Sequence, residues 1–206
     1  MTFGPLQIAF DDRVLRPREW TTAQSLWAAE LLPQLPDGPV LELCAGAGQI
    51  GLLAVLDSTR GLVCVDADET ACDFTLGNAL DAGMADRVEV RHARLEEAVG
   101  PHETFPLIIA DPPWVPRLDT SRFPEDPLTA IDGGDDGLDV ARACLQVIRD
   151  HLVPGGSALL QLGTAGQAED LGSEDGLLAS DELHLVEIRE HGRGVLVRID
   201  RRGREA

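Results

Sequence analysis

The tetrapeptide Asp111-Pro112-Pro113-Trp114 holds the side chains best suited to chemistry, and it directly follows a predicted buried strand. Consecutive prolines stiffen the backbone and leave carbonyl oxygens without neighbouring N–H donors. The carbonyl of Pro112 and the carboxylate of Asp111 can both accept hydrogen bonds from an amino group, and Trp114 offers a flat surface that also favours a cation. A rigid proline turn is the simpler alternative. In the functional interpretation, the tetrapeptide holds a nitrogen atom and aims its lone pair at an electrophile.

A glycine-rich turn supplies a second candidate site. The segment Gly46-Ala47-Gly48-Gln49-Ile50-Gly51 stands between a predicted strand and a predicted helix, where missing β-carbons let the backbone approach a ligand closely. Asp66 follows at about the spacing of an acid that binds both hydroxyls of a ribose, so a dinucleotide site also fits. Glu42 helps to distinguish a dinucleotide site from a site for a cofactor with an amino-acid group. A carboxylate at the end of the first strand would crowd a pyrophosphate but could orient a cationic amino-acid group.

These residues need a scaffold that brings strand ends together. Apolar runs alternate with helical segments, which is typical of an α/β fold with a mainly parallel sheet. Strands are predicted at 40–44, 61–66, 88–90, 107–110 and 158–162, and helices at 22–32, 50–56, 70–82 and 138–152. Residues 183–189 and 195–199 then form a closing antiparallel hairpin. Open α/β sheets bind ligands at the carboxyl ends of their strands, where the candidate residues stand.

Three segments between or after these elements are predicted to be irregular. Residues 111–135 are rich in Pro, Asp and Gly and predict a long irregular loop. Pro154-Gly155-Gly156 predicts a turn, and Arg201-Arg202-Gly203-Arg204 predicts a frayed tail. We expect one domain over residues 1–206, with residues 1–36 as a short N-terminal lead.

The amino-acid composition limits the kinds of partner that this protein is expected to bind. The formal net charge of -19 would repel a phosphate backbone, so nucleic acid is disfavoured. The four cysteines lie far apart without C-x-x-C spacing, which predicts buried thiols and neither a metal site nor a redox motif. The sequence shows no export signal and no apolar run of about 18 residues, so we expect a cytoplasmic protein without a membrane partner. The oligomeric state stays open.

At these motifs the sequence resembles the class I S-adenosylmethionine-dependent methyltransferases, and more narrowly the glutamine-amide methyltransferases that modify peptide-chain release factors and a ribosomal protein. The matching segments are Val14-Leu15-Arg16-Pro17-Arg18 with Thr21-Thr22, Leu41-Glu42-Leu43-Cys44-Ala45-Gly46-Ala47-Gly48, Val65-Asp66-Ala67-Asp68 with Ala71 and Asn78, Asp111-Pro112-Pro113-Trp114, and Ala130-Ile131-Asp132-Gly133-Gly134-Asp135-Asp136-Gly137-Leu138-Asp139.

The resemblance implies S-adenosyl-L-methionine as cofactor and a Rossmann-like fold with helices on both faces of the sheet. It assigns the methionine part to Glu42, Cys44, Ala45, Gly46 and Gly48, and the ribose to Asp66 with Ala67. It assigns the target nitrogen to Asp111, Pro112 and Trp114, with Asp111 also beside the cofactor. Arg94 stands where the family has an acidic residue near the adenine.

Two departures bear on the substrate. Asp111 replaces the asparagine of the family's N-P-P-Y motif, and ionised Asp only accepts hydrogen bonds, which suits an amine or guanidine better than an amide. Too few residues precede Val40 to build the family's N-terminal helical domain. We therefore expect an N-methyltransferase acting on a protein or peptide side-chain nitrogen or a small-molecule amine. An RNA or DNA amino group is the alternative acceptor. An NAD-type oxidoreductase or a non-catalytic cofactor-binding module is the alternative class.

Overall fold

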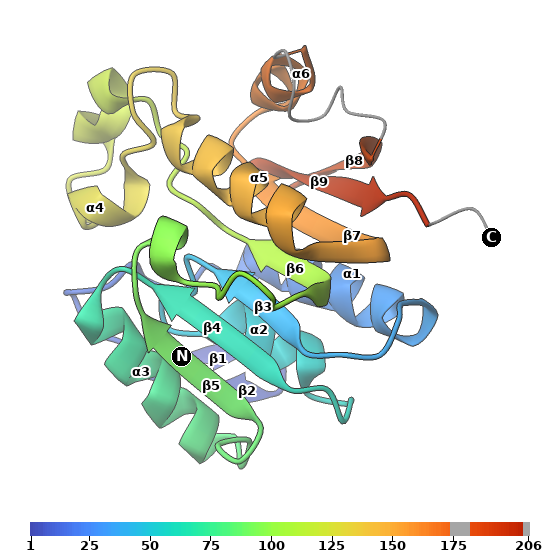
Figure 1. Cartoon of the computed structure of the whole chain (residues 1–206). Coiled ribbons are helices and arrows are strands. Elements are labelled where there is room, and N and C mark those ends of the chain that lie inside the picture. The colour runs from blue at the N-terminus through green and yellow to red at the C-terminus, as the bar shows by residue number, and fades with distance from the viewer. Residues whose placement is uncertain (174–181, 204–206) are drawn as a thin grey trace.

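A computed structural model describes residues 1–173 and 182–203, and within them the main sheet has seven strands (Figure 1). Their order across the sheet is β5-β4-β3-β6-β7-β9-β8; the first five are parallel to one another, and β9 is antiparallel to both β7 and β8. The strands are β3 Val40–Leu43, β4 Leu62–Asp66, β5 Val88–His92, β6 Phe105–Ala110, β7 Leu152–Leu162, β8 Leu183–His191 and β9 Gly194–Arg201. The predicted Rossmann-like sheet and its closing hairpin are confirmed.

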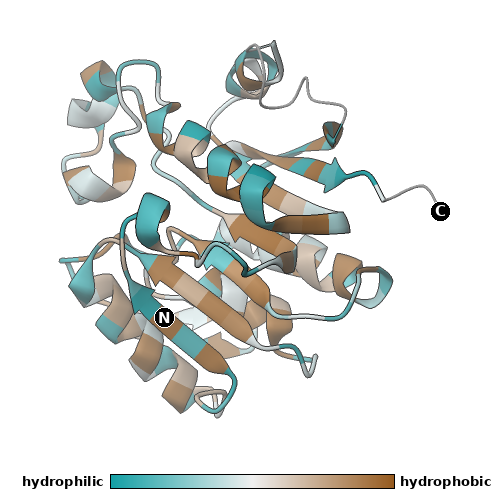
Figure 2. Cartoon of the chain, in the orientation of Figure 1, coloured by the Kyte–Doolittle hydropathy of each residue, from teal (hydrophilic) through white to brown (hydrophobic). Residues whose placement is uncertain are grey.

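Helices cover both faces of this sheet (Figure 1). One layer contains α1 Thr22–Leu31, α2 Gln49–Val55 and α3 Glu69–Asp81, and the other contains α5 Asp139–His151 and α6 Ala165–Ser173. Successive strand residues point to opposite faces, so Leu41 and Leu43 join the core under α5 whereas Val40 joins the core under α1 and α2. Figure 2 shows mostly hydrophobic strands between helices that have one hydrophobic and one hydrophilic side. Within the described ranges, none of the helices is long and apolar enough to cross a membrane.

The strand order creates the crevice in which the site lies. From β3 the chain moves outward through β4 to β5, and it then returns to place β6 on the other side of β3. The carboxyl ends of β3 and β6 are therefore neighbours, with Leu43 paired to Ala110. Such a reversal of strand order is where open α/β sheets bind ligands. The short 3-10 helix η3, Leu95–Glu97, takes the place of a full helix between β5 and β6.

The N-terminal lead is more regular than the sequence predicted. It begins with a small hairpin of β1 Thr2–Phe3 and β2 Leu6–Gln7, and the 3-10 helices η1 Glu19–Thr21 and η2 Leu32–Gln34 flank α1. Phe3 is buried against the α1 and α2 layer. Strands of two residues are too short to give a periodic pattern, which is why the hairpin was not predicted.

The prediction that residues 111–135 form an irregular loop is wrong in part. The segment contains the 3-10 helix η4, Arg117–Arg122, and the short helix α4, Leu128–Ile131. Val115 pairs with Asp132 in an isolated bridge, and Gly133 N donates to Val115 O at 2.9 Å. Backbone hydrogen bonds therefore fold this segment back on itself at the edge of the site.

Two smaller predictions also need correction, and α6 was not predicted at all. The Pro154-Gly155-Gly156 segment lies within β7, because Leu152 and Ser157 both pair with β6 and residues 153–156 bulge between them. Arg201 is the last residue of β9 rather than part of a tail, and its guanidinium donates to the carbonyls of Arg149 and Leu152. Arg204 lies outside the described residues.

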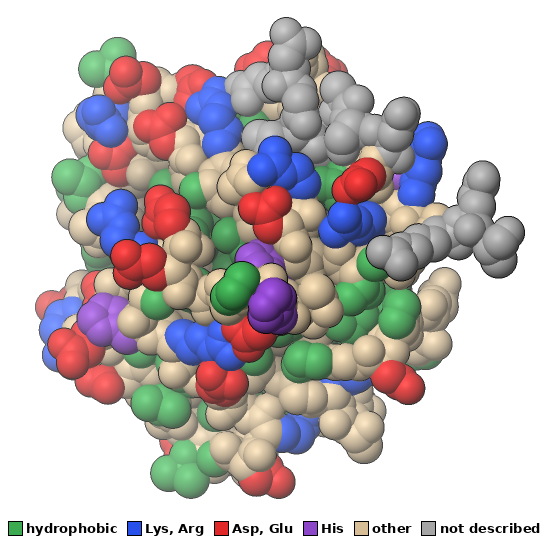
Figure 3. Space-filling view, in the orientation of Figure 1, with side chains coloured by type: hydrophobic (Ala, Val, Ile, Leu, Met, Phe, Trp, Pro, Cys, Tyr) green, Lys and Arg blue, Asp and Glu red, His purple; other side chains and the backbone are tan. Residues whose placement is uncertain are grey.

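Charges of both signs are mixed over the surface. On the face seen in Figure 3, Arg side chains stand beside acidic side chains rather than gathering into a basic field. Many are joined in ion pairs, such as Arg142 with Asp136 at 2.6 Å. This arrangement adds no positive surface on that face to offset the net charge of -19.

Candidate cofactor and acceptor site

A cavity of about 940 Å³ lies at the carboxyl ends of β3, β4, β5 and β6. Its wall is built from separate parts of the sequence that the strand order brings together. They are residues 13–18 with Thr21, residues 44–46 with Gln49, residues 65–69 with Ala71, residues 93–96, Asp111 with Pro113, residues 127–130 with Asp132, and Asp139, Val140 and Ala143. Most predicted site residues, including Ala45, Ala67 and Arg94, are on this wall.

The turn after β3 has an unusual backbone. The φ angles of Cys44, Gly46 and Gly48 are 57°, 57° and 77°. Among the described residues, Cys44 is the one residue other than glycine whose φ is positive. This region is disfavoured for residues with a β-carbon, so Cys44 is held there by its surroundings. A β-carbon on Gly48 would lie 2.8 Å from the Thr75 side chain, so α3 leaves no room at that position. The turn is thus fixed in shape, and Cys44, Ala45 and Gly46 line the cavity, whereas Gly48, for which a cofactor contact was also predicted, is not on its wall.

Asp66 supports this turn as well as facing the cavity. Its Oδ2 accepts a hydrogen bond from Gly46 N at 2.8 Å, and its Oδ1 accepts one from Asp68 N at 2.9 Å. Burial raises the pKa of the Asp66 carboxyl above its usual range. Each carboxylate oxygen can accept a further bond, so both ribose hydroxyls could still be bound. Asp68, rather than Asp66, caps α3, with its side chain accepting from Thr70 N and Ala71 N.

Glu42 lies near the end of β3, but its side chain does not face the cavity as the sequence analysis expected. Its side chain is 2% exposed and is absent from the cavity wall. Oε1 accepts from Gly51 N at 2.9 Å, and Oε2 accepts from the Cys64 thiol at 3.3 Å. Burial raises the pKa of Glu42 to about 7. A β-carbon on Gly51 would clash with the Glu42 carboxylate, so the third glycine of the motif makes room for Glu42 rather than for a ligand.

Asn78 joins the N-terminal lead to the glycine turn. Its Oδ1 accepts from Ala9 N at 2.7 Å, and its Nδ2 donates to Ala9 O at 3.0 Å and to Ala47 O at 2.9 Å. The side chain is 1% exposed, so these bonds are protected from water. The sequence singled out Asn78 only through the family resemblance, and this structural role was not foreseen.

Asp111 is the member of the tetrapeptide that faces the cavity together with Pro113. Burial raises the pKa of the Asp111 carboxyl to about 7. Pro112 and Trp114 are not on the cavity wall, which departs from the role predicted for them. The Trp114 ring lies over Gly163, and its carbonyl accepts from Gln167 Nε2 at 3.0 Å. The bridge between Val115 and Asp132 turns the chain just beyond Trp114.

The adenine side of the predicted site is more open. Arg94 lines the cavity beside Ala93 and Leu95, and its side chain is 79% exposed and lies 3.7 Å from Glu96. An exposed ion pair of this length contributes little free energy. The Arg94 side chain is therefore free to rearrange around a ligand.

The N-terminal lead and the segment before α4 meet beside the cavity. Arg18, which lines the cavity, donates to Asp126 at 2.6 and 2.7 Å. The Asp126 side chain is 8% exposed, so the pair is partly screened from water. These residues are 108 positions apart, and no sequence signal connects them.

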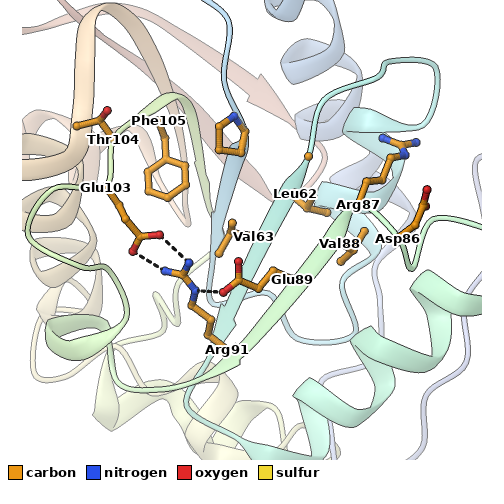
Figure 4. A pocket seen from close by; sticks show the side chains of 12 residues that line it. Leu62, Val63, Asp86, Arg87, Val88, Glu89, Arg91, Glu103, Thr104 and Phe105 are labelled. Atoms are coloured by element: carbon orange, nitrogen blue, oxygen red, sulfur yellow. Dashed lines mark hydrogen bonds and ion pairs between the residues drawn. The ribbon is translucent and has the colours of Figure 1, made fainter.

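A second cavity, of about 440 Å³, lies at the opposite end of the sheet, where the strands begin (Figure 4). Three charged side chains of this wall bind one another. Arg91 contacts Glu89 and Glu103, each at 2.7 Å, as the dashed lines show. None of the predicted site residues lines this cavity.

Residues 22–124, half of the 206-residue chain, match the family model named methyltransferase small domain. The chain belongs to this family. It is 32% identical over 136 residues to the ribosomal protein uL3 glutamine methyltransferase of Bradyrhizobium diazoefficiens, which covers 64% of this chain and 42% of the relative. It is 32% identical over 182 residues to the release factor glutamine methyltransferase of the same species, covering 82% of this chain and 59% of the relative. The chain thus spans about half the length of these relatives.

A solved structure supports the same fold. The crystal structure of ribosomal protein L11 methylase from Lactobacillus delbrueckii subsp. bulgaricus matches with a TM-score of 0.67 and 14% identity. The match covers 92% of this chain and 82% of that protein. At this identity the likeness concerns the fold. The architecture is therefore that of the Rossmann-like methyltransferases.

Proposed function

We propose that this chain is an S-adenosylmethionine-dependent N-methyltransferase whose acceptor is a protein or peptide side-chain nitrogen. One observation carries the proposal: the glycine turn, Asp66 and Asp111 line one cavity at the point where the strand order reverses. Membership of a methyltransferase family and relatives named as glutamine methyltransferases support it.

The residues of the cavity fit this cofactor. When bound, it supplies an electrophilic methyl group on a sulfonium sulfur. Asp66 has lone pairs left for two ribose hydroxyls, and Cys44 and Gly46 of the turn line the same space. Ala93 and Leu95 give the next part of the wall an apolar character suited to a purine ring. A cavity of about 940 Å³ leaves room for an acceptor side chain beside the cofactor.

Asp111 determines which nitrogen fits. A pKa of about 7 means that both protonation states are populated near neutrality. The protonated carboxyl donates one hydrogen bond and accepts another, as the family's asparagine does, and this pattern matches a primary amide. The ionised carboxylate only accepts and matches an amine or a guanidine. The expectation from sequence that Asp111 suits an amine therefore applies to the ionised form, and the raised pKa supports a protonated form that would suit glutamine.

The charge distribution favours a protein acceptor over a nucleic acid. A net charge of -19 repels phosphate, and the face in Figure 3 has no basic field. A side chain entering the cavity would be positioned by Asp111 and by the segment 127–132. Catalysis would then come mainly from holding the nitrogen in line with the methyl group.

The test is methyl transfer from radiolabelled cofactor to a matched acceptor panel. The panel contains a glutamine peptide, the same peptide with lysine or arginine in place of glutamine, a small amine and a stem-loop RNA. We expect label in peptide, and we expect Asp111→Ala to slow transfer strongly while S-adenosylhomocysteine still binds. Label in RNA alone would overturn the acceptor. Binding of NAD without binding of S-adenosylhomocysteine would overturn the cofactor.

A further inference from the structure

Leu128 differs from the other large apolar side chains that the described chain exposes. It is the first residue of α4 and is 58% exposed, and among the exposed large apolar side chains of residues 1–173 and 182–203 it is the one on the cavity wall. Leu118, in the nearby helix η4, is 92% exposed but is absent from that wall. Isolated exposed leucines are common and need no explanation. A leucine that faces both a cavity and solvent lies at the edge of the cavity, where it meets whatever enters.

Leu128 is part of a continuous wall formed by α4 and the start of α5. Asp132 N donates to Leu128 O at 2.9 Å, and Asp139 N donates to the carbonyl of Gly133 at 2.8 Å. These bonds place the start of α5 next to the end of α4. We call this surface the α4–α5 wall, and its main cavity-lining residues are Pro127, Leu128, Ala130, Asp139, Val140 and Ala143. Most of these side chains are apolar.

Asp139 gives the α4–α5 wall a negative charge. It is the first residue of α5, its side chain is 64% exposed, and its ion pair with Arg142 is 3.4 Å long. An exposed pair of this length contributes little free energy, so an arriving cation can compete for the carboxylate. The surrounding sequence has the same sign, because residues 117–139 contain seven acidic residues and two arginines. The α4–α5 wall is therefore complementary to a partner that is both apolar and positively charged.

Contacts on both sides of α4 hold the α4–α5 wall in place. Ile131, the last residue of α4, is buried, and the residue after it, Asp132, pairs with Val115. Before α4, Asp126 binds Arg18 of the N-terminal lead. A partner that binds this surface does not have to order it first, and that lowers the free-energy cost of binding.

The position of Asp111 in the same cavity indicates what binds to this wall. A side chain that reaches Asp111 from solvent is attached to a backbone at the edge of the cavity, and its neighbours in the acceptor chain meet that edge. We propose that the α4–α5 wall binds these flanking residues, with an apolar side chain packed on Leu128 and a lysine or arginine paired with Asp139. The inference rests on the protein or peptide acceptor proposed above. Contact with Leu128 removes apolar surface from water, and the acidic charge favours encounter with a basic segment.

The experiment measures methylation of short peptides that share the target residue methylated by the parent protein. In the reference peptide all flanking residues are serine, and in the others a leucine and an arginine are moved through the positions on either side of the target. We expect the best of these peptides to have a KM about 10-fold below that of the reference. Leu128→Ser should raise the KM of the best peptide about 3- to 10-fold and leave that of the reference within about twofold. Asp139→Asn should raise the KM of the best peptide about two- to fivefold at low salt and less at high salt.

Leu118→Ser is the matched control, because it removes an exposed leucine of the same segment that lies off the cavity wall. Its KM values should match those of the parent. Affinity for S-adenosylhomocysteine and stability to urea are measured for each variant. Both should stay close to the parent values, because Leu118, Leu128 and Asp139 are largely exposed and lie outside the groups assigned to the cofactor.

Three results would contradict these expectations. Equal KM values for the reference peptide and all the leucine–arginine peptides, or equal effects of Leu118→Ser and Leu128→Ser, would overturn the proposed docking. A change in the sedimentation of the peptide-free protein on Leu128→Ser would show that a second copy of the chain covers this leucine, and would also overturn it. Transfer to a small amine or to RNA without transfer to any peptide would instead overturn the protein acceptor on which the inference rests.

Discussion

Replacing Glu42 by Gln should stabilise the protein at neutral and alkaline pH without weakening cofactor binding. Burial raises the pKa of this carboxyl from 4.5 to about 7. The folded state therefore keeps a proton that the unfolded state releases, and the free energy of unfolding falls as pH rises from about 4.5 to 7. At about 1.4 kcal/mol for each pKa unit, the ionised carboxyl costs up to about 3 kcal/mol above pH 7.

Glutamine removes this cost because it cannot ionise, while its Oε1 can still accept from Gly51 N. We expect Glu42→Gln to match the parent near pH 4.5 and to exceed it by about 1 to 3 kcal/mol at pH 8, measured by urea unfolding at both pH values. Glu125→Gln is the matched control, since Glu125 is exposed and should give no such gain. A variant less stable than the parent at pH 8 that also lost cofactor affinity would show that Glu42 faces the ligand as an anion.

Three further changes test the rest of the site. Asp66→Ala should weaken S-adenosylhomocysteine more than Asp66→Asn does, because alanine removes both ribose acceptors and the support of Gly46; equal calorimetric affinities of Ala variant and parent would contradict this. Asp111→Ala should lower kcat by the equivalent of about 2–4 kcal/mol with cofactor affinity almost intact, and Asp111→Asn should remove a pH dependence of glutamine-peptide methylation near pH 7. Undiminished turnover in Asp111→Ala would show that Asp111-Pro112-Pro113-Trp114 is only a rigid turn and has no role in methyl transfer. Breaking the Arg18 pair by Asp126→Asn should speed hydrogen exchange in residues 127–132, and unchanged exchange would mean that the pair does not hold this part of the cavity wall in place.

Buried parallel strands were the most predictable part of the fold. β3, β4 and β6 are covered on both faces, so each gives a largely apolar run that a sequence reveals directly, broken in β3 by Glu42 and ending in β4 at Asp66. Turn residues placed the candidate side chains at the carboxyl ends of those strands, and the strand order then gathered most of them around one cavity. The ends of these elements agree within one or two residues.

The direction of Glu42 was missed although the sequence contains a signal for it. Alternation along β3 puts Glu42 on the same face as Val40, toward α2, and opposite to Leu41 and Leu43. Other contacts have no local signal. The pair of Arg18 and Asp126 depends on where two distant segments cross, and no spacing in a single sequence records that.

The hydrogen bonds of Asn78 have a consequence for how the limits of this protein are drawn. The family match begins at residue 22, yet Ala9, which Asn78 binds together with the glycine turn, lies before it. A shortened protein starting at residue 22 would keep the whole segment that matches the family model. It would also leave the amide of Asn78 half satisfied behind the turn. The segment that matches the family model is therefore smaller than the part of the chain that must fold together to hold the glycine turn in shape.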